Sequence, residues 1–169
     1  MKKQPTPKQR DIDILFDKYT ASHQKPVNKI INWICVPLVV FGLLGLAWAI
    51  PFPYLSFMGK YNGYINWASV LIAFSIYFYL KISPILSYLM LFILFAFSFG
   101  IIQLDQWYKT GGPGVGELCI AILIIAFTAQ FIGQKIEGKR YSLVNSVKFW
   151  FYGPIWLLSL VLKRFNVKY

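Results

Sequence analysis

Long runs of sequence without a charged residue most constrain how this chain can fold. Between Ile30 and Leu80 the only charged residue is Lys60, and between Ser83 and Leu104 there is none. Uncharged apolar runs of about 18 residues or more are typical of membrane-spanning helices. Only 14% of the residues are charged, whereas soluble domains average roughly a quarter. We therefore expect an all-α integral membrane protein.

The apolar runs predict one membrane domain over residues 1–169 with four transmembrane helices, each near the roughly 20 residues that a bilayer core requires. We expect the spans at about 31–50, 64–80, 84–104 and 115–133. The turns between them are "IPFPYL" with "YNGY", "KIS" before Pro84, and "GGPGVG" at 111–116, which lacks the GK[ST] of a phosphate loop. Cys35 and Cys119 lie inside apolar segments, where we expect them to act as small hydrophobic residues.

Two further helices are expected at the ends of the chain. Residues 1–29 form a cytoplasmic amphipathic segment, with Thr6 as a helix cap and Pro7 at the first helical position. It lies on the membrane surface or packs against the other helices. Its apolar face consists of Ile12, Leu15, Phe16 and Tyr19. Segment 149–162 is too short to span, and Gly153-Pro154 is expected to break a helix there, so we predict an interfacial or re-entrant helix.

The placement of the basic residues predicts the orientation of the chain. If 149–162 does not cross, fifteen of the seventeen Lys and Arg residues fall on one side, and only Lys60 and Lys109 on the other. Because Lys- and Arg-rich loops stay in the cytoplasm, both termini are expected there, in the inner membrane if the protein is bacterial or the endoplasmic reticulum if it is eukaryotic. The net charge of +11 then reflects orientation and attraction to lipid headgroups, not nucleic-acid binding.

Two polar clusters fall on the expected cytoplasmic side. Within each cluster, several residues are spaced so that they share one face of a helix. Polar side chains at membrane depth usually face the bundle interior or a hydrated cavity, although amides there often only join helices. We expect both clusters to line one pocket. The first cluster is Tyr19, His23, Gln24, Asn28 and Asn32, and the second is Gln130, Gln134, Glu137, Lys139 and Arg140.

The same segments resemble the signatures of a known family. "HQKPVNKIINWICVPL" is similar to H-x-x-P-x-N-x-x-x-H-x-x-x-x-P-L, and "QFIGQKIEGKRYSL" to Q-F-x-G-H-x-x-E-G-[KR]-x-P. "GPIWLL" also resembles the closing segment of this membrane-embedded, iron-dependent 2-hydroxy-fatty-acid dioxygenase family. The resemblance implies α-oxidation that shortens 2-hydroxy fatty acids by one carbon, for example during sphingolipid degradation, using Fe²⁺ held by histidines. It also implies a pocket where the carboxylate of a fatty acid meets water while the tail stays in lipid.

The sequence departs from these signatures at the metal ligands. His23 matches the first signature histidine, but Asn32 and Gln134 replace the other two, and Tyr141 replaces a proline. Side-chain amides are poor ligands for ferrous iron, and of the carboxylates Glu137 is better placed than Asp105 near the opposite face. The resemblance places the catalytic positions at His23, Asn32, Gln134 and Glu137. Of the polar clusters, we expect these residues to bind substrate: Tyr19, Asn28, Gln130, Lys139 and Arg140. With His23 as its metal ligand, the site is incomplete, and we expect no tightly bound iron.

The sequence is compatible with three different functions. The first is a working dioxygenase with an unusual iron site. The second is a catalytically silent relative that binds a lipid or fatty acid. The third is a structural membrane subunit without a ligand, or an inactivated variant of an active parent.

Overall fold

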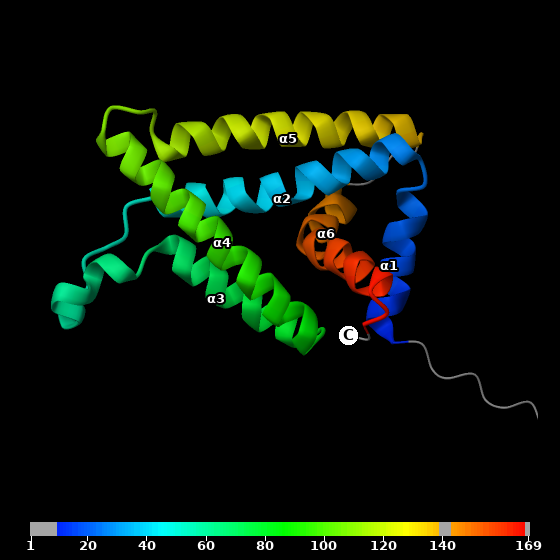
Figure 1. Cartoon of the computed structure of the whole chain (residues 1–169), viewed down its shortest axis with the longest axis horizontal. Coiled ribbons are helices and arrows are strands. Elements are labelled where there is room, and N and C mark those ends of the chain that lie inside the picture. Colours follow the sequence, from blue (N-terminus) through cyan, green and yellow to red (C-terminus); the bar gives the residue numbers. More distant parts are fainter. Residues whose placement is uncertain (1–9, 139–142, 168–169) are drawn as a thin grey trace, which may run out of the picture.

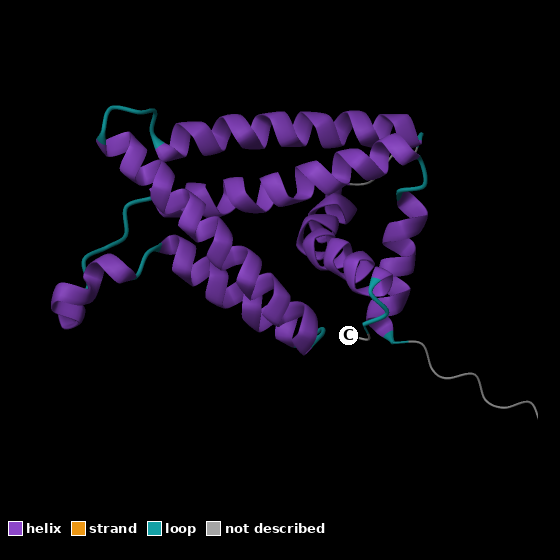
Figure 2. Ribbon diagram, in the orientation of Figure 1, coloured by secondary structure: helices purple, strands orange, loops and turns teal. Residues whose placement is uncertain are grey.

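The computed structural model describes residues 10–138 and 143–167, and every regular element within these ranges is helical (Figure 2). The prediction of an all-α protein is confirmed. In chain order the elements are α1 (Asp11–Ser22), α2 (Pro26–Ala49), the short 3₁₀ helix η1 (Ser56–Tyr64), α3 (Trp67–Leu80), α4 (Pro84–Lys109), α5 (Val115–Glu137) and α6 (Leu143–Arg164).

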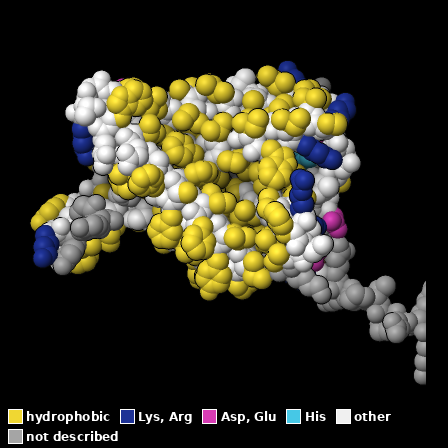
Figure 3. All heavy atoms as spheres, viewed as in Figure 1, with side chains coloured by type: hydrophobic (Ala, Val, Ile, Leu, Met, Phe, Trp, Pro, Cys, Tyr) yellow, Lys and Arg dark blue, Asp and Glu magenta, His cyan; other side chains and the backbone are white. Residues whose placement is uncertain are grey.

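Three helices, α2, α4 and α5, are long and apolar enough to cross a membrane. They correspond to three of the predicted spans, with boundaries shifted by a few residues. Hydrophobic side chains cover much of the face seen in Figure 3, as expected for helices in contact with lipid. The candidate spans indicate an integral membrane protein.

The fourth predicted span, 64–80, corresponds to a shorter apolar helix, α3, of 14 residues. The helix begins only at Trp67 because Asn66 and Ser69 form a capping box. The Asn66 side chain accepts a hydrogen bond from the Ser69 N–H at 3.0 Å, and the Asn66 N–H donates to Ser69 Oγ at 3.1 Å. Whether α3 crosses the membrane stays a prediction.

Helices α2 and α5 run antiparallel and form the most extensive helix pair (Figure 1). Their buried residues recur at alternating spacings of four and three, the pattern of two helices packed along their length. Polar residues lie where α2 begins and α5 ends, and the other positions of the pattern are occupied by apolar or small residues. The buried residues of this pattern are Asn28, Asn32, Cys35, Val39 and Gly42 on α2, and Cys119, Leu123, Ala126, Gln130 and Gly133 on α5.

Glycines on α2 allow this close approach. A Cβ atom on Gly45 would overlap the Cys119 sulfur, and one on Gly42 would lie 2.7 Å from Leu123 Cγ. Small residues bring membrane helices together in this way because dispersion contacts between them replace contacts with lipid. Cys119 therefore acts as a packing residue, and both cysteines are buried free thiols, as their apolar surroundings predicted.

Helices α3 and α4 form an antiparallel hairpin through the tight turn predicted before Pro84 (Figure 1). Ser83 caps α4, with its Oγ accepting a hydrogen bond from the Leu86 N–H at 3.4 Å, and Pro84 takes the first helical position. Proline suits this position because the first N–H groups of a helix have no partner within it.

The prediction that Gly153-Pro154 breaks a helix is wrong. Helix α6 continues from Leu143 to Arg164 with Pro154 inside it. Proline removes one backbone donor, but Ile155 and Trp156, which follow it directly, are buried in the core. Packing against neighbouring helices compensates for the lost hydrogen bond, as it does in many membrane helices. An interfacial or re-entrant position for α6 stays a prediction.

Helix α1 packs its predicted apolar face against α6 (Figure 1). Phe16 and Tyr19 are buried, so of the two predicted locations for this face the structure supports packing against other helices. The helix begins at Asp11, after Arg10 in an extended conformation, which is later than the predicted start at Pro7. The predicted cap, Thr6, lies outside the described residues.

Candidate functional site

The start of α2 and the end of α5 meet at Glu137, although the residues involved lie up to 113 positions apart in the sequence. Glu137 Oε1 accepts a hydrogen bond from the Gln24 N–H at 2.7 Å. Its Oε2 accepts from the Lys25 N–H at 3.2 Å and from the Asn28 side chain at 3.0 Å. The structure thus brings residues of the two polar clusters into direct contact.

Each of these two helix ends is capped by a charged residue of the other. Lys25, the N-cap residue of α2, makes no side-chain capping bond to its own helix, and the Glu137 carboxylate of α5 accepts that residue's N–H instead. In return, the Lys25 ammonium group donates to the carbonyl of Ile136 in the last turn of α5. A carboxylate is stabilised at the partly positive start of a helix, and an ammonium group at the partly negative end.

The surroundings of Glu137 favour its ionised form. Glu137 is the last residue of α5 and lies beyond the apolar part of the helix. Partial burial raises the pKa of its carboxyl, but the hydrogen bonds from Gln24, Asn28 and Lys25, with the charge of His23, outweigh this effect. The pKa of Glu137 therefore lies below its ordinary value of 4.5, and the group is a carboxylate at neutral pH.

Asn28 and Asn32 are buried between α2 and α5 and are bonded to each other. The Asn32 amide nitrogen donates to the Asn28 carbonyl oxygen at 2.9 Å and to Asn28 Oδ1 at 3.0 Å. A Cβ atom on Gly133 would lie 2.5 Å from Asn28 Oδ1, so a larger residue at 133 would displace this amide. Gln130 is buried on the same face of α5, while Gln134 is only half-buried.

His23 lies in an aromatic cluster at the junction of α1 and α6. Its ring stacks on Tyr19, with centroids 4.5 Å apart and planes within 10°. Trp156 of α6 lies 4.4 Å from the Tyr19 ring and 5.8 Å from that of His23. His23 Nδ1 is 2.9 Å from the carbonyl oxygen of Tyr19. A carbonyl oxygen only accepts, so Nδ1 carries the proton and donates it there.

Sequence reasoning missed two residues of this cluster. Trp156 packs against the Tyr19 ring, and its Nε1 donates to Thr20 Oγ1 at 3.0 Å. The "GPIWLL" segment contains Trp156, so its likeness to the closing segment of the family was the available signal, whereas nothing in the sequence singled out Thr20. Lys139 and Arg140, which were predicted to bind substrate, lie outside the described residues.

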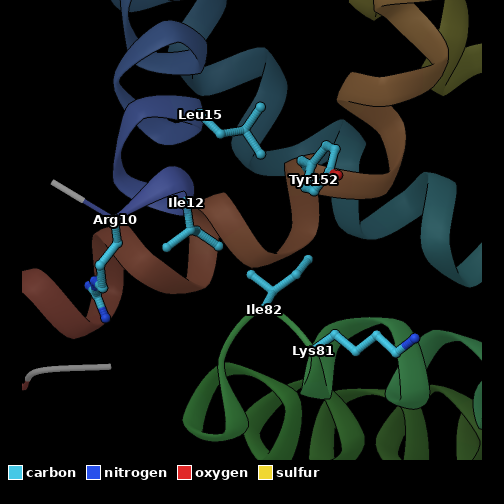
Figure 4. Close-up of a pocket in the computed structure, with 6 residues that line it drawn as sticks. All are labelled: Arg10, Ile12, Leu15, Lys81, Ile82 and Tyr152. Carbon is cyan, nitrogen blue, oxygen red and sulfur yellow. The ribbon is translucent and has the colours of Figure 1, made fainter. Parts of the chain in front are cut away.

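One cavity, of about 440 Å³, lies between α1, the turn after α3 and α6 (Figure 4). Ile12, Leu15, Ile82 and Tyr152 surround it, while Arg10 and Lys81 lie at opposite edges of this group of side chains. None of these lining residues belongs to the two polar clusters. A single pocket lined by both clusters therefore stays a prediction.

Two apolar cavities lie on α6 beside Pro154. The larger, of about 240 Å³, lies between α2, α4 and α6, and the smaller, of about 130 Å³, also borders α3. Val40, Met90 and Pro154 line both cavities. Because the two share these walls, they are neighbours, and together they offer a partly open apolar space bordered by α2, α3, α4 and α6.

The described residues do not suit the ferrous ion that the resemblance implies. Within residues 10–138 and 143–167, no three His, Cys, Asp or Glu side chains lie close enough together to hold a metal ion. Both oxygens of Glu137 already accept hydrogen bonds, and Asn32 turns its amide nitrogen, which cannot act as a ligand, toward Asn28. Asp105 instead pairs with Lys109 on α4, with 2.7 Å between Oδ2 and Nζ. Ferrous sites generally need several imidazole or carboxylate ligands.

Comparisons with known proteins agree with the resemblance seen in the sequence. Neither the curated proteins nor the solved structures include a match to this chain. The family model described as "2-hydroxy-palmitic acid dioxygenase Mpo1-like" matches residues 10–165, a range that contains the contacts at Glu137, the aromatic cluster around His23 and the cavities beside Pro154. The chain therefore belongs to the Mpo1-like 2-hydroxy-palmitic acid dioxygenase family.

Proposed function

We propose that this protein binds a 2-hydroxy fatty acid at the end of the bundle where His23 lies, and that it oxidises this ligand slowly or not at all. The observation that carries the proposal is the closeness of the aromatic cluster to the apolar cavities. A Cβ atom on Gly153 would lie 3.1 Å from Tyr19 Oη and 3.5 Å from Val36. Val36 lines the larger cavity, so Gly153 packs between the Tyr19 hydroxyl and a wall of that cavity.

These two neighbouring regions, one polar and one apolar, match the two parts of a 2-hydroxy fatty acid. The carboxylate and hydroxyl would lie near His23, Tyr19, Asn28 and Gln130, where hydrogen-bonding side chains are concentrated. We further propose that Lys139 and Arg140 are the cations that bind the carboxylate of the fatty acid. The alkyl tail would enter the cavities beside Pro154, because burial of apolar surface away from water drives its binding. Family membership supports the same class of ligand.

The chemistry of the donor groups supports the second part of the proposal. Of the four residues that the resemblance places at catalytic positions, His23 is an imidazole and Glu137 is a carboxylate, while Asn32 and Gln134 are amides. Since Glu137 is engaged in capping α2, the part of the chain that the structure describes offers no group of three His, Cys, Asp or Glu side chains of the kind that ferrous iron requires. We infer that iron binds weakly and that turnover is correspondingly low.

A structural role without a ligand is the second candidate. It is favoured by the exchange of caps between α2 and α5, because the hydrogen bonds of Glu137 and Lys25 join the ends of these two helices. For either role we propose the same orientation, with both termini and the His23 end of the bundle in the cytoplasm, because the positive-inside rule requires it.

The test places a larger side chain at a residue that lines both cavities. Val40→Trp would occupy the proposed tail site, while Ile34→Trp on the same helix, where Ile34 is 57% exposed, serves as the matched control. Binding of labelled 2-hydroxypalmitate to the full chain in lipid nanodiscs is measured for both. We expect Val40→Trp to weaken binding on the order of tenfold, in line with the loss of a buried apolar contact, and Ile34→Trp to leave it unchanged.

Three controls separate the candidate functions. Palmitate, which lacks the hydroxyl, should bind less tightly than 2-hydroxypalmitate. Iron per protein and oxygen-dependent loss of 2-hydroxypalmitate are measured on the same preparation. Absence of binding in the parent chain would favour the structural role. One iron per chain with sustained turnover would refute our interpretation of Asn32 and Gln134 and would show that the protein is an active dioxygenase.

A further inference from the structure

The loop between α2 and α3, residues 50–66, exposes large apolar side chains at its tip and extends away from the helix bundle (Figure 1). Phe57 is 84% exposed and Tyr54 is 74% exposed. Lys60 is the only charged residue of this segment, and it contains no carboxylate. We refer to residues 50–66 as the tip loop.

The tip loop has a defined internal structure. The Asn62 side chain closes it by accepting a hydrogen bond from the Leu55 N–H at 2.7 Å and donating to the Leu55 carbonyl at 2.8 Å. Asn62 also donates to the carbonyl of Gly59 at 3.1 Å. Gly59 has a positive φ of 49°, which glycine adopts readily and which turns the chain at the tip.

The base of the tip loop is fixed to the start of α3. Trp67 Nε1 donates to the carbonyl of Pro51 at 3.2 Å, and the Phe52 ring packs edge-on against the Trp67 ring with centroids 5.1 Å apart. We refer to the three hydrogen bonds of the Asn62 side chain as the Asn62 clasp. This clasp and the contacts at the base fix the conformation of the loop in which Phe57 and Tyr54 are exposed. An apolar tip that is held in place and exposed points to a binding surface.

We propose that the tip loop inserts Phe57 and Tyr54 into the headgroup layer of the surrounding bilayer. It joins two apolar helices, and one of them, α2, is long enough to span, so its base lies at the level of the membrane surface. Aromatic side chains are enriched at this level because they have an apolar ring and, in tyrosine, a polar end. The absence of carboxylates and the presence of Lys60 suit a layer of lipid phosphates. The Asn62 clasp also bonds backbone groups of Leu55 and Gly59 that lipid could not satisfy.

The experiment measures the depth of the tip directly. A fluorescent label is attached to Phe57→Cys in the full chain carrying Cys35→Ala and Cys119→Ala, reconstituted in phosphatidylcholine vesicles. Pro113→Cys in the same background is the matched control, because Pro113 is exposed in the α4–α5 loop at the same end of the bundle (Figure 1). Quenching by lipids with a nitroxide near the headgroup is compared with quenching by iodide in the water.

We expect the ratio of lipid quenching to iodide quenching at position 57 to exceed that at 113 on the order of tenfold, since Tyr54 remains in the labelled variant to hold the tip in the headgroup layer and burial of an aromatic side chain is worth about that factor. Adding Asn62→Ala should lower the ratio at 57 toward the control, because the clasp no longer directs the tip. Equal ratios at the two positions would overturn the proposal. Protection of position 57 from both quenchers would also overturn it, and would indicate that a second protein chain covers the tip.

Discussion

Removing the charge of Glu137 should loosen the junction between α2 and α5. The carboxylate accepts hydrogen bonds at 2.7, 3.0 and 3.2 Å from three donors on and before α2. Glu137→Gln keeps the shape of the side chain, but it removes the charge and replaces one acceptor oxygen with a donor. A helix cap contributes about 1 kcal/mol, and hydrogen bonds to charged groups contribute about 1.5–3 kcal/mol when buried.

The half-buried position of Glu137 places the expected loss at the lower end of this range. We expect Glu137→Gln to lower the free energy of unfolding by about 1 kcal/mol, because solvent screens part of the charge. For a chain of this length the midpoint of thermal unfolding should fall by about 2–4 °C. The measurement is thermal unfolding in detergent, followed by circular dichroism, with Glu117→Gln as the matched control on α5.

The control removes a carboxylate that is weakly engaged. Glu117 accepts one hydrogen bond, from the Gly114 N–H at 3.4 Å, within its own helix. Its replacement should cost less than about 0.5 kcal/mol, as for most exposed charges. Equal shifts in the two variants would refute the idea that Glu137 joins α2 to α5.

The pH dependence of the Glu137 effect has a definite sign. A carboxyl whose pKa is lower in the folded chain contributes stability above its unfolded value, here about 4.5, and loses it as the pH falls through the folded pKa. The stability difference between parent and Glu137→Gln should therefore be fully present at pH 7 and shrink below pH 4.5. A difference that grows in acid would contradict the hydrogen bonds described for Glu137.

Two further variants test packing and the metal site. Gly45→Ala should lower the free energy of unfolding by about 1–3 kcal/mol because its Cβ overlaps the Cys119 sulfur. Adding Cys119→Ala to this variant should recover most of the lost stability in the same unfolding assay. If stability is not recovered, the strain does not come from the contact with Cys119. Asn32→His with Gln134→His should raise iron per protein above either single change, because each adds an imidazole at a signature position. Asn32→Gln with Gln134→Asn is the control that keeps amides at both positions, and a double histidine variant without iron would put the family assignment of these positions in doubt.

Local sequence patterns were enough to predict much of the fold. Uncharged apolar runs predicted α2, α4 and α5, and the apolar positions from Ile12 to Tyr19 predicted the buried face of α1. Pro84 after a polar turn predicted the α3–α4 hairpin. These features depend on hydropathy and on spacing within one turn of helix, both of which can be read over a few residues.

Local rules failed where neighbouring helices change the balance. Pro154 was expected to end a helix, yet α6 continues because buried residues on either side of it pack against other helices. The start of α3 was misplaced because the Asn66–Ser69 capping box and the turns of η1 take up residues that hydropathy alone assigned to a span. Propensities are weak compared with such packing and capping terms.

The candidate site divides in the same way between sequence and tertiary structure. An apolar helical protein with two polar clusters could be predicted from the order of residue types, because hydropathy and helical spacing follow directly from that order. In contrast, the capping of α2 by the Glu137 carboxylate and the stacking of His23 with Tyr19 near Trp156 depend on how the helices fold together. These contacts join residues separated by as many as 133 positions, and their geometry depends on how whole helices pack against one another.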